Sequence, residues 1–359
     1  MDILALVERI GESPTAALFG LITGLIFGVS AQRSQFCLRA ATVEFAHGKG
    51  IDGKLGPKVA VWLLTLSTAI VWVQGAQMLG LFRASDARIM AVPGSWSGAI
   101  IGGLMFGAGM VLSRGCSGRL LVLASTGNLR SVVSGLIFAV TAQMSLHGIL
   151  APYRDKLASL SITPGGENIN LLNALHLPSG TGLVLGLAFA ALALYLAARH
   201  QIGPKTWIFA SGVGFSVAVG WVLTWSLAQI AFDPVPVTSA TFSGPSANTL
   251  MFFLDRGAVL EFDVGLVPGV VLGAFLAAMI SGEFRWQSFE SVPVMRKSMI
   301  GAVLMGFGAM LAGGCAIGNG VTGGSVFAAT AWLALLSMWI GAIATTLVFD
   351  RQVNPALAC

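Results

Sequence analysis

Residues Leu311–Ser325 read LAGGCAIGNGVTGGS and place a thiol, Cys315, among glycines. They lie within Ser298–Phe349, a stretch of 52 residues without a charged side chain. Two membrane-spanning helices of roughly 20 residues each account for about 40 of these residues. Nothing in the remainder would hold a loop in water. We therefore expect a helix that breaks inside the membrane around Cys315.

A broken helix is tolerated in a membrane only where its backbone is buried in protein or lines a cavity. Glycine permits the sharp turn and the close approach of a ligand. We expect a short helix from Ile317 to Ala329, whose free N–H groups and positive dipole end would face the thiol and favour an anion. Gly314 and Asn319 are candidate contacts of that anion, although Asn319 is equally suited to capping the helix.

The composition of the whole chain is that of a membrane protein. Of its 359 residues, 55% are hydrophobic and 10% are charged, whereas soluble domains carry about 25% charged residues. We therefore predict an all-α, polytopic fold with about nine transmembrane helices and short re-entrant half-helices. Nine apolar segments are long enough to cross a bilayer: 16–33, 58–80, 95–113, 129–150, 180–198, 206–231, 264–281, 298–312 and 329–349.

The distribution of charge predicts the orientation. When each Lys and Arg is assigned to its nearer loop, 14 fall on the side of the C-terminus and 6 on the side of the N-terminus. By the positive-inside rule the C-terminus is cytoplasmic and the N-terminus is outside, in a bacterial inner membrane. The net charge of +5 thus reflects topology and gives no support to nucleic-acid binding. None of the nine segments contains Asp or Glu, so we expect no carboxylate relay for protons.

A short unit recurs along the chain. GLIFG at Gly24–Gly28 returns as GLMFG at Gly103–Gly107, and the two stretches that precede Cys116 and Cys315 align without a gap. In three places a cysteine follows nine residues after a glycine: Gly28 and Cys37, Gly107 and Cys116, and Gly306 and Cys315. A fourth copy at Gly212–Trp221 is weak. The alternative interpretation is that such glycines only pack helices together.

The positions of the repeats predict two inverted halves. Cys116 follows the third span and Cys315 the eighth, so the two turns open toward opposite faces. We expect a first half at 1–150, a connecting loop and linking span at 151–198, and a second half at 199–359. Inverted repeats with interrupted helices are typical of transporters, and the site lies where the halves meet.

The other two cysteines of the repeat also lie in electropositive turns. The candidate contacts around them are Arg39 after Cys37, and Arg114, Gly115, Ser117 and Arg119 around Cys116. A thiol suits a soft sulfur atom, whereas N–H groups and Arg suit hard oxygens. Thiosulfate has both a soft terminal sulfur and hard oxygens. The alternative is that these cysteines are small buried apolar residues.

The cysteine spacing excludes other chemistry. There is no C-x-x-C pair and no His spacing suited to a metal, so we expect neither zinc nor a disulfide framework, and no cofactor. Cys359 is the last residue, and we expect it to be functionally silent. Trp221 is assigned to packing.

Three stretches resemble the YeeE/YedE family of membrane proteins: QRSQFCLRAA (Gln32–Ala41), GAGMVLSRGCSGRLL (Gly107–Leu121) and GGCAIGNGVTGGS (Gly313–Ser325). Characterised members take up thiosulfate. The resemblance implies nine spans with short embedded helices, and a narrow path along which Cys37, Cys116 and Cys315 pass thiosulfate by S–H contacts to its sulfur. It also implies a small cytoplasmic sulfur-carrier protein as a possible partner.

One departure from the family pattern leaves the cargo open. Ser113-Arg114 stands where the family usually has small residues, and a guanidinium beside the thiol would be compatible with another sulfur or a selenium compound. A membrane-embedded thiol oxidoreductase or sulfurtransferase that forms a persulfide on Cys116 is the main rival, but it would favour a resolving cysteine nearby. A passive anion channel is a second rival. We predict a transporter and not an enzyme.

Overall fold

The computed structural model describes residues 3–48, 55–178, 180–288 and 291–349, and within them every regular element is helical. Nine candidate membrane spans are found among these residues, as predicted. Their long helices are α2 (Glu12–Ser34), α4 (Pro57–Met78), α6 (Trp96–Leu112), α8 (Leu129–Leu146), α11 (Thr181–Arg199), α12 (Pro204–Ala228), α14 (Phe262–Ser281), α15 (Val292–Leu311) and α16 (Ala329–Phe349).

The shorter helices fall into two groups. The first group follows a helix break or precedes a span: α3 (Leu38–His47), α7 (Ser117–Ser125), α13 (Gly244–Leu254) and the π-helical η2 (Gly318–Gly323). The second group belongs to the connections: α1 (Ile3–Ile10), η1 (Ala84–Asp86), α5 (Arg88–Ala91), α9 (Ala151–Ala158) and α10 (Leu171–Ala174).

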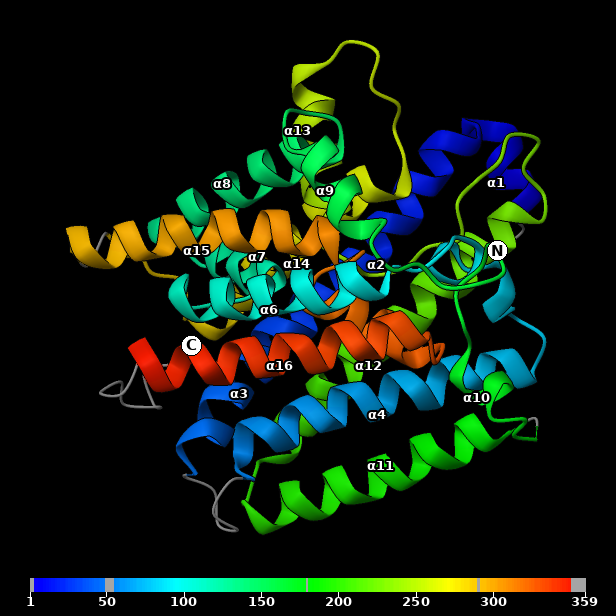
Figure 1. Ribbon diagram of the computed structural model, residues 1–359. Coiled ribbons are helices and arrows are strands. Elements are labelled where there is room, and N and C mark those ends of the chain that lie inside the picture. The colour runs from blue at the N-terminus through cyan, green and yellow to red at the C-terminus, as the bar shows by residue number, and fades with distance from the viewer. Residues whose placement is uncertain (1–2, 49–54, 179, 289–290, 350–359) are drawn as a thin grey trace.

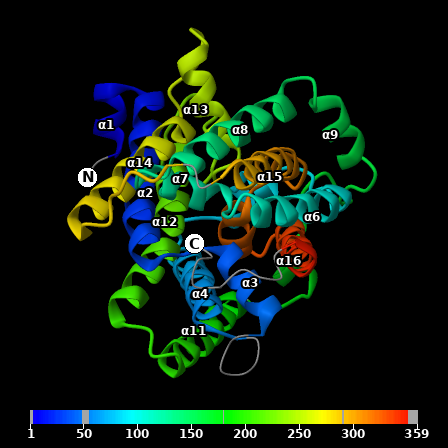
Figure 2. The ribbon, with the colours of Figure 1, turned by 90° about the vertical axis from the view of Figure 1, so that its left-hand side faces the viewer.

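The long helices form one bundle. In Figure 1, α15, α6, α16, α4 and α11 run roughly parallel across the view, and Figure 2 looks nearly along α6, α15 and α16. Helix α1 lies at one end of the bundle and the C-terminal end of α16 at the other. The nine spans of the described residues, an odd number, place the beginning of the first span and the end of the last on opposite sides of the membrane.

The repeated glycines lie where helices approach closely. A Cβ atom at Gly24 or Gly28 of α2 would collide with the backbone of α14, and one at Gly107 of α6 with the backbone of α16. A Cβ at Gly306 of α15 would meet Thr141 of α8. Close helix packing therefore does explain these glycines, because small residues at membrane-helix interfaces allow the backbones to approach each other. The fixed distance to a cysteine has a separate cause, which is the helix break that follows.

Three helix breaks share one backbone device. In each, a residue in the left-handed conformation lies two positions before the cysteine: Gln35 (φ 52°), Arg114 (φ 57°) and Gly313 (φ 76°). This conformation ends the incoming helix and turns the chain. The next helix then starts at the residue after the cysteine, so the sequence spacing of the repeat becomes a repeated geometry.

Charged residues extend three spans beyond the apolar segments that were expected. Helix α2 begins at Glu12, and α14 begins at Phe262 and includes Asp263; an acidic side chain favours a helix N-terminus. Helix α15 begins at Val292 and includes Arg296 and Lys297. Carboxylates thus lie in the first turns of two spans, where none was expected.

Candidate functional site

The three cysteines of the repeat occupy equivalent positions in the structure. Cys37 and Cys116 are the N-cap residues of α3 and α7, and Cys315 directly precedes the short helix that contains η2. None of the three forms a disulfide, and all are buried, with exposed fractions of 3%, 1% and 0%. Cys359 lies outside the described residues.

The structure brings the three thiols into one region. Cys116 lies close enough to Cys37, to Cys315 and to the guanidinium of Arg119 for charges on these groups to interact. Three segments that are far apart in the sequence therefore meet in the interior of the bundle, where α7 packs against α2, α8 and α14.

Backbone N–H groups hold the sulfur of Cys315 in place. Its Sγ accepts hydrogen bonds from the backbone N–H of Phe242 at 3.3 Å and of Gly318 at 3.4 Å. Cys116 occupies the N-cap position of α7 but makes no side-chain capping hydrogen bond. Cys315 thus takes the role that Ser or Asp usually has at an N-cap, and its thiol lies among donors that would suit an anion.

The half-helix after Cys315 is shorter than predicted. It begins at Ala316 and ends at Ser325, and α16 starts at Ala329, so the expected Ile317–Ala329 helix is wrong at its C-terminal end. Phe327 adopts φ 55° and turns the chain into α16. Within the half-helix, Gly318–Gly323 is π-helical, a local conformation that is frequent at functional sites.

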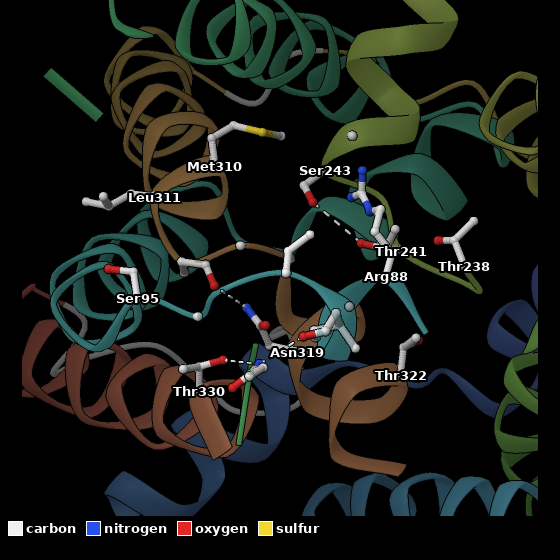
Figure 3. Close-up of a pocket in the computed structure, with 18 of the residues that line it drawn as sticks. Arg88, Ser95, Thr238, Thr241, Ser243, Met310, Leu311, Asn319, Thr322 and Thr330 are labelled. Atoms are coloured by element: carbon white, nitrogen blue, oxygen red, sulfur yellow. Dashed lines mark hydrogen bonds between the residues drawn. The ribbon is translucent and has the colours of Figure 1, made fainter. Parts of the chain in front are cut away.

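Asn319 stabilises the glycine turn. Its Nδ2 donates to the carbonyl oxygen of Ala312 at 3.2 Å (Figure 3) and to that of Gly314 at 2.8 Å. Both hydrogens of this amide therefore have acceptors within the turn. Of the two roles considered for Asn319, these contacts favour the structural one. The carbonyl oxygen of Gly314 contributes to the site by accepting one of these hydrogen bonds.

The first turn of α7 contains donors without partners. Arg119 is 6% exposed, and its Nε and Nη1 have no hydrogen-bond partner; the Oγ of Ser117 is also buried without one. Buried polar groups are nearly always paired, so each such group requires an explanation. A bound anion beside Cys116 would satisfy all three atoms. Gly115, immediately before the thiol, is buried.

The remaining two arginines occupy different surroundings. Arg39 is 1% exposed in the first turn of α3, two residues after Cys37. Arg114 instead lines a separate cavity of about 100 Å³ together with Lys297, Pro293 and Phe349. The expected guanidinium beside Cys116 is therefore Arg119, because the left-handed turn at Arg114 directs that side chain toward α15 and α16.

A larger cavity opens on the N-terminal side of the bundle, where α8 and α15 end and α14 and α16 begin. Its volume is about 500 Å³, and it reaches Gly318 and Asn319 of the half-helix. Thr241 lines it (Figure 3). The Oγ1 of Thr241 lies 3.8 Å from the Sγ of Cys315. Trp221, which was assigned to packing, also lines this cavity. The cavity thus reaches residues that contact Cys315.

A fourth half-helix was missed by the sequence analysis. Helix α13 starts after Ser243, which lines the cavity next to Thr241. The weak fourth copy at Gly212–Trp221 lies instead inside the uninterrupted α12. The available signal was Ser243-Gly244-Pro245, because Ser is favoured at an N-cap and Pro in the first turn of a helix.

Membrane-spanning helices that break around buried thiols, next to a polar cavity, define a membrane transport protein. Sequence comparison identifies its family. The chain belongs to the sulphur transport family, whose sequence profile matches residues 33–344. The resemblance found in the sequence motifs is thereby confirmed.

Two relatives match over nearly the whole chain. The thiosulfate transporter TsuA of Escherichia coli K12 is 28% identical over 94% of this chain and 96% of its own length. The thiosulfate transporter TsuA of Spirochaeta thermophila is 27% identical over 90% of this chain and 96% of its own. A probable transporter of Salmonella typhimurium, YedE, is 27% identical over 49% of this chain and 39% of its own length.

Proposed function

We propose that this protein imports thiosulfate along a path marked by Cys315, Cys116 and Cys37. Membership of the sulphur transport family and the names of the two full-length relatives support a transporter of a sulfur-containing anion, and not an enzyme. The observation that carries the proposal is the proximity of three buried cysteines that form no disulfide, each at the start of a half-helix.

The chemistry of each contact fits the two ends of thiosulfate. The terminal sulfur is soft and accepts an S–H group, while the oxygens accept the unpaired donors of Arg119 and Ser117. The cavity next to Cys315 supplies the entrance, and Cys37, at the start of α3, leads to the opposite face. A half-helix end at each thiol stabilises the negative charge as the anion passes.

The same path would open outward at the cavity and inward near Cys37, with the N-terminus outside and the C-terminus in the cytoplasm of a bacterial cell. A dianion that enters against a negative interior moves uphill by about 4.6 kcal/mol at 100 mV. A small sulfur-carrier protein that removes the cargo inside would help to draw the anion inward. We propose such a protein as the partner.

Uptake of ³⁵S-thiosulfate into proteoliposomes tests this function. We expect Cys116→Ala and Cys315→Ala to lower uptake at least roughly tenfold, because about 1.4 kcal/mol lost from one contact has that effect. Cys359→Ala is the control and retains uptake. Uptake at the wild-type level in the first two variants, with equal amounts in the membrane, would contradict the cysteine path.

The same preparation separates the competing functions. Thiosulfate that accumulates intact supports transport, whereas labelled sulfur retained on Cys116 as a persulfide supports a sulfurtransferase. Competition by sulfate, sulfite and selenite identifies the cargo. Because only a molecule with a soft terminal atom uses the thiols, sulfate should compete weakly.

A further inference from the structure

Four residues form the boundary between two cavities on the N-terminal face. The cavity of about 500 Å³ and a neighbouring one of about 270 Å³ are both lined by Arg88, Thr238, Asn248 and Asp263. We call these four residues the partition. They come from α5, the segment before α13, α13 itself and α14, and all four are accessible from both cavities.

Arg88 brings positive charge to the partition. Its backbone N–H donates to the carbonyl of Val237 at 2.9 Å, which fixes α5 against the segment that leads to α13. Figure 3 shows its guanidinium group in the same part of the cavity as Ser243 and Thr241. A guanidinium presents a planar set of donors that matches the oxygens of an oxyanion.

Asp263 offsets this charge when no anion is bound. Its Oδ2 accepts a hydrogen bond from Nδ2 of Asn248 at 2.9 Å, and the carboxylate interacts electrostatically with Arg88. An anion with two negative charges beside Arg88 would repel this carboxylate. Like charges disfavour each other's ionised form, so a proton on Asp263 relieves the repulsion.

We propose that the partition is an outer binding site for a divalent oxyanion, at which Asp263 takes up one proton from the external medium for each anion bound. Arg88 and the amide of Asn248 hold the anion's oxygens. The proposal relies on the proposed function only for the identity of the anion. Loading anion and proton together lowers the net charge at the site from two negative charges to one.

Two further observations place unused donors at the same cavity. Helix α13 starts there without a side-chain cap, since Ser243 makes no capping hydrogen bond. Trp221 is 2% exposed, lines the cavity, and its indole N–H has no partner. Both kinds of donor suit an anion.

Other titratable groups surround Asp263. His147 lines the larger cavity, and the smaller one is lined by Glu12, Asp233 and Glu261. Helix α13 has no titratable side chain, and α7, which also packs on α14, contributes Arg119. Glu12 of α2 already accepts the backbone N–H groups of Phe232 at 2.7 Å and Asp233 at 3.3 Å. Asp263 is thus the carboxylate that borders both cavities and interacts with Arg88.

Titration calorimetry of the purified protein with sodium thiosulfate tests the site. Measurement in two buffers of different ionisation enthalpy counts protons; we expect about one taken up per anion by the wild type, and none by Asp263→Asn. Arg88→Gln should weaken binding at least tenfold, whereas Arg88→Lys should retain part of it. His147→Gln is the control and should keep the wild-type proton count.

The outcomes separate this inference from the proposed function. Wild-type binding without proton uptake, an unchanged proton count in Asp263→Asn, or unchanged affinity in Arg88→Gln would overturn the inference. Proton-linked binding should survive in Cys116→Ala even though its transport is lost. A wild type that binds thiosulfate with a proton but never transports it would instead refute the proposed function alone.

Discussion

At the scale of single residues, the recurring feature is a cysteine in the place of a helix cap. The sulfur of Cys315 accepts the backbone N–H of Gly318, three positions later. A serine oxygen makes the same bond at many N-caps. Capping alone therefore gives no reason for sulfur, and we propose that the cargo requires the soft atom.

Serine variants separate the two roles of the thiols. We predict that Cys116→Ser and Cys315→Ser fold normally, because serine has nearly the shape of cysteine and at position 315 its hydroxyl keeps the bond to Gly318. Both variants should lose uptake of thiosulfate roughly tenfold or more, because the soft contact is gone. Uptake of ³⁵S-thiosulfate and the melting temperature in detergent measure the two effects. If the serine proteins transport as well as the wild type, the sulfur has only a structural role.

Arg119 and Arg114 form a matched pair around Cys116. We predict that Arg119→Gln lowers the affinity for thiosulfate about tenfold or more, since a hydrogen bond to a charged group contributes about 1.5–3 kcal/mol. Arg114→Gln should transport normally because Arg114 lines a separate cavity. The measurement is the KM of uptake. The reverse order of effects would place the anion on the other side of the thiol.

The sequence predicted some of these residues and missed others for a physical reason. The thiols and Arg119 were found because a fixed spacing and a short distance along one helix determine their positions. Arg88, Asp263 and Ser243 were missed because they meet only through tertiary packing of α5, α13 and α14.

At the scale of helices, function depends on where each helix breaks and on how closely its neighbour approaches. The left-handed residue two positions before each cysteine determines where the helix breaks. Glycines on the helix before the break allow a helix of the other half to pack closely against it. The nine spans were predictable from hydropathy, with ends within a few residues. The π-helical conformation of Gly318–Gly323 was not, because no sequence period encodes it.

The glycine contact between α2 and α14 gives the next prediction. We expect Gly24→Leu to destabilise the protein by about 1–3 kcal/mol or more, because the side chain would have to enter the backbone of α14. Gly135→Leu is the control, since nothing lies within 4 Å of a Cβ at that position of α8. Thermal unfolding followed by tryptophan fluorescence compares the two. Equal melting temperatures would show that the helices can move apart at no cost.

At the scale of the whole molecule, the packing supports the two-halves organisation. If α2, α3, α4, α6 and α8 of the first half correspond to α12, α13, α14, α15 and α16 of the second, the main contacts between the halves form matching pairs. The contact of α2 with α14 matches that of α12 with α4, the contact of α6 with α16 matches that of α15 with α8, and the contact of α3 with α16 matches that of α13 with α8. We propose that 1–150 and 199–359 are inverted repeats, in which Ser243 of α13 corresponds to Cys37 of α3.

Such a pair of halves has a defined orientation in the membrane, and single-cysteine labelling tests it. Phe232 follows α12 on the N-terminal face and is 99% exposed; Trp286 follows α14 on the opposite face and is 76% exposed. Because Lys and Arg favour the second face by 14 to 6, the positive-inside rule predicts that this face is cytoplasmic. In a Cys359→Ala background, an impermeant maleimide should label Phe232→Cys in intact spheroplasts and Trp286→Cys only after lysis. The opposite result would turn the large cavity toward the cytoplasm and make it the exit of the path, so the direction of transport proposed above depends on this measurement.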